Sequence, residues 1–212
     1  MTKLEQAIEL AKKLHKGQKR KDGSDYINHP LAVMELLKKY DFPEDALIAA
    51  ILHDICEDTE VCSIDINKLF GTRVGFIVNA LSKNQKPKNN EALKREYKEK
   101  EKQTKISNLE TYKDYDEYFD YRFHIYLNRF YTGIIAEPRI FFIKIADQLN
   151  NLSDMTPFSK EKKLRKINEI EEFFIPIYKK AKDFFISKEN NNQCDIFIDL
   201  LIDKIKEAKK SL

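Results

Sequence analysis

The sequence predicts an all-α protein that forms a single domain. Apolar residues recur at a spacing near 3.6 along most of the chain, and alternating strand patterns are absent from the sequence. Only 5 glycines and 6 prolines interrupt the 212 residues, while hydrophobic residues make up 42% of them, which is enough for a sizeable core. Because no internal repeat or linker divides the chain, we expect residues 1–212 to fold as one helical bundle.

The first helices follow from apolar spacing and from the positions of proline. Residues 3–16 carry an apolar face made by Leu4, Ile8, Ala11 and Leu14. The segment "GQKRKDGSDYINHP" at 17–30 has the glycine and Asp-Gly punctuation of a loop. Pro30 and Pro43 suit the first turns of the next two helices. We therefore expect helices from 30 to about 40, from 43 to about 57, over 64–69 and over 72–82.

Residues 84–138 differ in composition and are predicted to be a long helical insertion. The segment begins with a very polar stretch and continues into "TYKDYDEYFDYRFHIYLNRFY", which holds six of the ten tyrosines. An aromatic stripe with this spacing favours packing, against the body of the domain or a second subunit in a homodimer, over stacking on a substrate. His124 is expected to pack among these rings. An interaction surface for another protein on this insertion is compatible with any of the functions considered below.

The last part of the chain returns to an apolar helical pattern. "EPRIFFIKIADQLNNLSDM" predicts a largely apolar helix, and two further helices are expected over 159–187 and 193–210. The first of these carries a narrow polar stripe, because Asp147, Asn151 and Asp154 are four and then three residues apart.

Composition excludes several classes of protein. No segment approaches the roughly 18 apolar residues of a membrane span, and the first residues lack the apolar stretch of a signal peptide. Three cysteines without a CxxC motif indicate a reduced, cytoplasmic setting rather than a disulfide framework. A net charge of +3 is too small to indicate a nucleic-acid-binding protein. The positive charge gathers at residues 12–21, which indicates either a solvated helix end or an edge suited to phosphates.

The stretch "AAILHDICEDT" ends an apolar helix in ionisable residues. His53 and Asp54 are adjacent there, and His29 and Asp147 also lie at the edges of apolar helices. Taken alone, each of these four residues could be a helix cap, a surface residue or the partner of an arginine. Together, two imidazoles and two carboxylates suit a divalent transition ion, with positions left open for water or phosphate, as in a catalytic site. His15, at the end of the first helix, is expected to be structural.

The same residues carry a family resemblance. The order His…His-Asp…Asp on helices resembles the HD superfamily of metal-dependent phosphohydrolases. "GQKRKDGSDYINHPLAVMELL", "ALIAAILHDICEDTEV" and "IKIADQLNNL" are similar to the hydrolase domain of the RelA/SpoT family and to the stand-alone small alarmone hydrolases. "FGTRVGFIVNALSK" and "INEIEEFFIPIYKKA" extend the similarity, which covers residues 3–83 and 138–180.

The resemblance implies a fold, an activity and a set of site residues. It implies an HD-domain helical bundle that hydrolyses the 3′-pyrophosphate of the guanine nucleotides ppGpp and pppGpp with a manganese ion, for which other divalent transition ions are alternatives. The implied metal ligands are His29, His53, Asp54 and Asp147, and Glu57 and Asp58 match the family's catalytic acids. Arg20, Lys21, Tyr26, Lys83 and Asn151 match positions that contact the nucleotide.

Elementary chemistry agrees with these roles but leaves alternatives open. One acid can take a proton from water and a second can protonate the ribose oxygen that leaves, which gives a reason for two carboxylates. Gln148 and Asn150 stand where the family often has arginine and histidine, a difference that bears on the substrate more than on the metal. The alternatives are an HD phosphohydrolase that acts on another nucleotide and a non-catalytic nucleotide-binding module.

Overall fold

The computed structural model describes residues 1–83, 115–185, 191–210 and 212, and in this part of the chain no β-strand forms. The all-α prediction is confirmed. In chain order the elements are α1 (Lys3–Leu14), α2 (Asn28–Lys39), α3 (Glu44–Leu52), α4 (Ile55–Asp58), α5 (Ser63–Phe70), α6 (Thr72–Leu81), α8 (Tyr115–Ala136), α9 (Arg139–Ser153), α10 (Lys160–Glu169), the π-helix η1 (Ile170–Phe174), α11 (Ile175–Phe185) and α12 (Asn191–Lys210).

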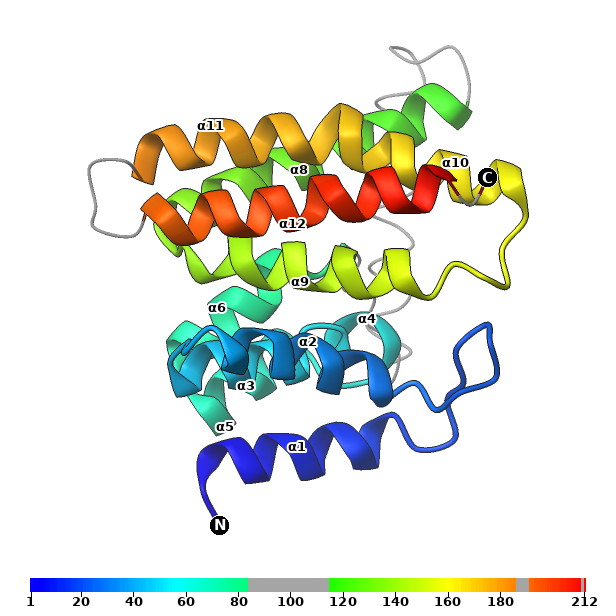
Figure 1. Cartoon of the computed structure of the whole chain (residues 1–212). Helices are drawn as coiled ribbons and strands as arrows, with labels where there is room; N and C mark the ends of the chain where they lie inside the picture. Colours follow the sequence, from blue (N-terminus) through cyan, green and yellow to red (C-terminus); the bar gives the residue numbers. More distant parts are fainter. Residues whose placement is uncertain (84–114, 186–190, 211) are drawn as a thin grey trace.

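The helices are stacked in layers that place α9 at the centre of the molecule (Figure 1). One side of α9 contacts α2 and α3, and the other side contacts α12 and α8. The N-terminal helix α1 covers α3 from outside. Because α2, the α3–α4 junction and α9 are neighbours, residues from three distant parts of the sequence meet beside α9.

The centre of the core is aromatic and lies around Phe141 of α9. Its ring is fully buried and meets Phe142, Tyr178 and Phe185 edge to face, at centroid distances of 4.9, 5.1 and 6.2 Å. Such contacts add to the free energy of burying the ring itself. This packing holds α9 against α11 and so stabilises the helix that carries Asp147.

Replacing Phe141 by alanine is therefore expected to lower the free energy of unfolding by about 3–5 kcal/mol, since it leaves a large cavity. The matched control is Phe76→Ala, because the side chain of Phe76 is 44% exposed. Urea denaturation of both variants measures the difference. Equal losses of stability would show that the core is not centred on this ring.

The helix expected from residue 43 to about 57 is interrupted, so that prediction is wrong in its extent. Regular helix ends at Leu52, and α4 begins at Ile55 after a turn at His53 and Asp54. Asp54 has φ −93° and ψ −9°, and the backbone N–H groups of Glu57 and Asp58 both donate to its carbonyl oxygen. Because the turn changes the direction of the chain, two adjacent side chains reach one site.

The helix expected over 159–187 contains a π-helical turn. α10 and α11 are continuous through η1, which ends two residues before Pro176 in α11. Proline has no N–H and clashes with the preceding helical turn, and a local π-turn is one way to accommodate it. This π-turn lies beside α9. Single π-turns inside α-helices are frequent at functional sites.

The insertion expected at 84–138 is described only in part. Residues 84–114 lie outside the described residues, and α8 forms the remainder. Phe130 of α8 is fully buried and packs edge to face on Phe174 and Tyr178, at centroid distances of 5.6 and 6.3 Å. His124 contacts the ring of Phe173. This end of the aromatic stripe therefore packs against the body of the domain, as expected.

Within the described residues, no helix combines the length and the apolar composition that crossing a bilayer requires. The three cysteines are free thiols.

Candidate metal centre and active site

Three structural elements bring the predicted ligands together. His29 lies in the first turn of α2, His53 lies at the α3–α4 junction, and Asp147 lies in the middle of α9. Asp147 Oδ1 is 3.1 Å from His29 Nε2 and 3.8 Å from His53 Nε2. One ligand atom of each residue lies within 4.8 Å of the others, and all three side chains are buried.

Asp54 borders the same cluster. Its Oδ2 lies 3.5 Å from His29 Nε2 and 3.2 Å from His53 Nε2, and it also accepts a hydrogen bond from Tyr26 Oη at 2.6 Å. Ligand atoms about 2.0–2.2 Å from one ion lie roughly 3.0–3.6 Å from each other. Three of the four distances fall in this range, and the fourth, 3.8 Å between Asp147 Oδ1 and His53 Nε2, is slightly longer.

The far side of each imidazole is held by a hydrogen-bond acceptor. His29 Nδ1 lies 2.6 Å from Asn150 Oδ1, and His53 Nδ1 lies 2.8 Å from the carbonyl oxygen of Ala50. Each Nδ1 therefore donates, and each Nε2 faces the cluster, as in metal-bound histidines. His53 Nε2 is buried and makes no hydrogen bond, so a cation would satisfy it. The chemistry of these groups fits a divalent metal ion, and His29, His53 and Asp147 form a cluster that could hold one, with Asp54 at its edge.

Two polar residues beside the cluster were missed by the sequence analysis. Lys144 Nζ lies 2.7 Å from Asp147 Oδ2; the side chain of Asp147 is buried and that of Lys144 is 12% exposed. Although burial raises the pKa of Asp147, Lys144 and the two histidines outweigh burial and hold that pKa well below its usual range. Asn150 was treated only as a departure from the family, yet it orients His29. The spacing of Lys144 three residues before Asp147 was the available signal.

The two predicted catalytic acids occupy different environments. Glu57 lines the cavity in front of the cluster, and its Oε1 accepts a hydrogen bond from the backbone N–H of Lys83 at 2.5 Å. Burial raises the pKa of Glu57 above the ordinary 4.5. Asp58 is exposed and is not among the residues that line this cavity. Its backbone oxygen accepts a hydrogen bond from Gln18.

The cavity holds about 940 Å³, the open space at its entrance included, and most of its lining residues are charged or polar. All five predicted substrate-contact residues line it: Arg20, Lys21, Tyr26, Lys83 and Asn151. Arg20 Nη2 lies 3.1 Å from Asn151 Oδ1 and 3.1 Å from Asp154 Oδ2, which ties the 17–30 loop to α9. Lysine and arginine side chains that share one cavity with carboxylates suit a phosphate-bearing ligand that also meets a cation.

His15 is confirmed as a residue at a helix end. It is the C-cap of α1, its Nδ1 lies 2.8 Å from Gln18 Oε1, and its ring lies 4.8 Å from that of Tyr26. It therefore supports the loop from behind the site and does not line the cavity.

Comparison with known proteins supplies independent evidence. The sequence profile of the HD domain matches residues 7–114. A GTP pyrophosphokinase of Streptomyces antibioticus is 31% identical over 84% of this chain and 18% of its own length. The bifunctional (p)ppGpp synthase/hydrolase SpoT of Escherichia coli is 28% identical over 82% of this chain and 21% of its own length.

One further curated relative and one solved structure extend the comparison. The guanosine-3′,5′-bis(diphosphate) 3′-pyrophosphohydrolase of Aquifex aeolicus is 26% identical over 99% of this chain and 26% of its own length. These curated relatives are long, so the chain spans about a fifth to a quarter of each. A solved structure described as a metazoan ortholog of SpoT that hydrolyzes ppGpp superposes with a TM-score of 0.56 and 22% identity, over 96% of both chains. That likeness shows the fold.

Proposed function

The chain belongs to the HD domain family, and from this premise we propose that it hydrolyses the 3′-pyrophosphate of ppGpp and pppGpp, giving GDP or GTP and pyrophosphate. The observation that carries the proposal is the cluster of His29, His53, Asp54 and Asp147 beside a cavity whose lining holds five basic and five acidic side chains, Glu57 among them. The curated relatives named as 3′-pyrophosphohydrolases support the same reaction.

We further propose that the four-residue cluster holds manganese, with other divalent transition ions as alternatives. When bound, the ion supplies a Lewis acid that stabilises negative charge on phosphate oxygens and makes water more acidic. Two imidazoles and two carboxylates suit such an ion. Lys144 remains paired with Asp147 and limits the negative charge of the cluster.

The chain's own groups then bind the nucleotide and move protons. Arg20, Lys21 and Lys83 bind phosphate and neighbouring oxygens at the cavity wall, while Tyr26 donates to Asp54 and holds it in place. Glu57 accepts the proton of the attacking water. The water oxygen bonds to the phosphorus that is attached to the ribose 3′ oxygen, and the bond between that phosphorus and the 3′ oxygen breaks. The leaving oxygen takes a proton, for which Asp58 is the proposed donor, although its exposed side chain does not line the cavity in this structure.

A second candidate reaction is the hydrolysis of a phosphate ester on another nucleotide. It is favoured by Gln148, a neutral residue beside Asp147 whose Oε1 accepts a hydrogen bond from Tyr178 Oη at 2.8 Å. A panel of nucleotides tested with purified protein and Mn²⁺ decides between the two. Release of pyrophosphate from ppGpp, well above release of phosphate from other nucleotides, supports the proposal. Binding of a nucleotide without hydrolysis of any nucleotide in the panel would indicate that the protein is a nucleotide sensor instead.

Replacing Asn150 by alanine is expected to weaken divalent-metal binding about 10–100-fold, because His29 loses the acceptor that orients its ring. Calorimetric titration of the protein with Mn²⁺ measures this directly, without any substrate. Ser153→Ala is the matched control, since Ser153 is an exposed residue on the same helix. Equal affinities in the wild type and Asn150→Ala would remove Asn150 from the site.

A further inference from the structure

The carboxylate of Glu57 accepts a hydrogen bond from a backbone group outside its own helix. The donor is the N–H of Lys83, which follows the end of α6, at 2.5 Å from Glu57 Oε1. This N–H belongs to the peptide group that joins Ser82 to Lys83, and the carbonyl oxygen of Ser82 is the other end of that group. Because a peptide group is planar, the direction of its C=O determines the direction of its N–H.

Arg129 of α8 binds the opposite end of this peptide group. Its Nη2 donates to the carbonyl oxygen of Ser82. Ser82 is fully buried, and its N–H and Oγ both donate to the carbonyl oxygen of Val78, at 3.1 and 2.8 Å. A charged donor on the C=O polarises the peptide and strengthens the hydrogen bond that its N–H makes on the other side. Arg129 and Glu57 are therefore linked through one peptide group.

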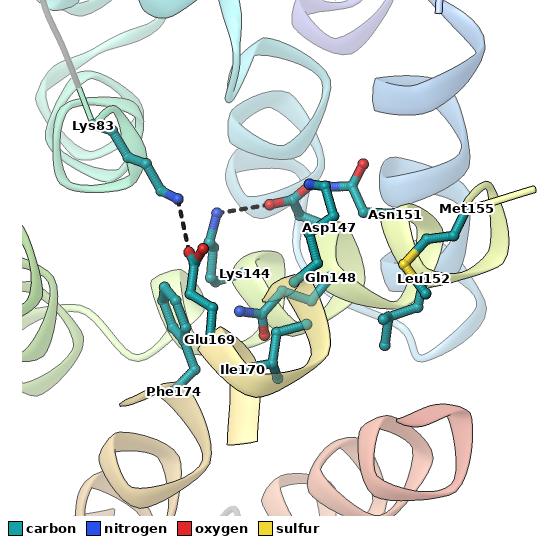
Figure 2. A pocket seen from close by; sticks show the side chains of 11 residues that line it. Lys83, Lys144, Asp147, Gln148, Asn151, Leu152, Met155, Glu169, Ile170 and Phe174 are labelled. Carbon is teal, nitrogen blue, oxygen red and sulfur yellow. Dashed lines mark hydrogen bonds and ion pairs between the residues drawn. The ribbon is translucent and has the colours of Figure 1, made fainter. Parts of the chain in front are cut away.

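The side chain of Tyr126, on α8, holds two cations at this junction. Its ring centre lies 5.9 Å from the guanidinium of Arg129 and 5.6 Å from Lys83 Nζ, which is within the range of cation–π attraction. Lys83 Nζ also lies 3.2 Å from Glu169 Oε1, and Figure 2 shows the side chain of Lys83 directed at Glu169. The side chain of Lys83 is thus engaged by α8 and α10, while its N–H is directed at Glu57.

We propose that Arg129 is a positioning residue for Glu57 and acts through the Ser82–Lys83 peptide. Arg129 is not among the residues that line the cavity, so it acts on the reaction through another group. The catalytic consequence rests on the proposed function, in which Glu57 accepts the proton of the attacking water. A displacement of about 1 Å at a reacting group can cost about 100-fold in rate, so a fixed carboxylate matters. The helix α8, which forms the described end of the insertion, then contributes to the active site from outside the cavity.

The kinetic test is a double-variant cycle. Arg129→Met keeps an unbranched side chain over Tyr126 and removes every donor of the guanidinium. It is expected to lower kcat for ppGpp about tenfold and to leave KM within about twofold, because Arg129 does not bind the substrate. In the Glu57→Gln background, the same change is expected to cost less than about twofold, since its effect passes through the Glu57 carboxylate. An unchanged kcat, a loss confined to KM, or a full additional tenfold loss in the double variant overturns the inference.

A matched control separates positioning from net charge. Arg165→Met removes an exposed arginine from α10 and is expected to keep kcat within about twofold. Arg129 is also an exposed residue, so Arg129→Met is expected to fold and to unfold at nearly the wild-type temperature. A loss of kcat in Arg165→Met equal to that in Arg129→Met would assign the effect to net charge and overturn the inference.

Nuclear magnetic resonance tests the link without any substrate. The charged and titratable groups that face Glu57 are Asp54 and Cys56 near its own helix, Lys83 after α6, Tyr126 of α8 and Lys144 of α9. All of them act on the titration of Glu57, so the amide proton of Lys83 is the more specific probe. In the full chain with Zn²⁺, which is diamagnetic, this proton is expected to shift downfield as Glu57 loses its own proton, because the acceptor becomes charged. The shift is expected to be absent from Glu57→Gln and at least about twofold smaller in Arg129→Met.

The resonance test also separates this inference from the proposed function. A shift of the Lys83 amide proton in Arg129→Met that equals the wild-type shift overturns the inference. If Arg129→Met loses the shift as expected and the wild type hydrolyses no ppGpp, the proposed reaction is wrong and the link between Arg129 and Glu57 remains.

Discussion

Replacing Asp147 by asparagine is expected to reduce ppGpp hydrolysis by roughly 1000-fold or more, the equivalent of about 4 kcal/mol of transition-state stabilisation. Asparagine keeps the shape of the side chain but removes the charge that would bind the cation. Asp147 Oδ1 lies within 3.8 Å of both histidines, and Asp54, the other carboxylate beside them, is proposed as a ligand in its own right and so does not replace it. Steady-state release of pyrophosphate measures the loss, and Mn²⁺ titration shows whether metal binding is lost with it.

The same substitution is expected to destabilise the fold, and this effect must be separated from catalysis. It leaves the largely buried Lys144 without its carboxylate partner, which costs about 3 kcal/mol or more. The double variant Lys144→Met with Asp147→Asn removes both charges and is expected to recover most of the stability but no activity. The exposed Asp183→Asn, on α11, serves as the control for the charge change. Recovery of activity in the double variant would contradict the assignment of Asp147 as a metal ligand.

Replacing Glu57 by glutamine is expected to lower kcat about 100- to 10,000-fold, the usual contribution of a general base. Metal binding should change little, because Glu57 lines the cavity and is not one of the four proposed ligands. Glu60→Gln is the matched control, since Glu60 is an exposed acid three residues later. Retention of full kcat in Glu57→Gln would assign the proton transfer to another group, with Asp58 the first to test.

The pH dependence of the wild type provides a second measure of Glu57. A general base acts only when deprotonated, and burial raises the pKa of Glu57 above 4.5. The rate is therefore expected to fall as the pH decreases through this raised pKa and to reach a plateau above it. This fall in rate at low pH should be absent from the residual activity of Glu57→Gln. If the rate falls in the same way in both proteins, the fall is caused by the protonation of another group.

Most of the helices were predictable because each one buries a single face. The apolar spacing in α1, α9 and α12 reflects contact with the core, which is a local property of the sequence. The turn at His53 and Asp54 was not predictable in this way, since the surrounding residues favour helix and tertiary contacts decide the break. The π-turn had only a weak signal in Pro176, because a proline can also bend a helix or end it.

The proposed metal ligands were identified from residue types and order, whereas their supports were not. Asn150 and His29 are 121 positions apart in the sequence, so their hydrogen bond exists only after α2 packs on α9. The same holds for Gln148, whose amide is oriented by Tyr178 from another helix. Sequence spacing can place a residue on a helix face, but it does not show which side chain from elsewhere will meet it.

The most direct test of the proposed reaction is the release of pyrophosphate from ppGpp by protein freed of metal with a chelator and then supplied with Mn²⁺. We expect negligible release from the metal-free protein, full release of GDP and pyrophosphate in equal amounts after Mn²⁺ is added, and no such recovery in Asp54→Ala. Cleavage that is unaffected by chelation, or that persists in Asp54→Ala, would contradict a metal-dependent 3′-pyrophosphohydrolase.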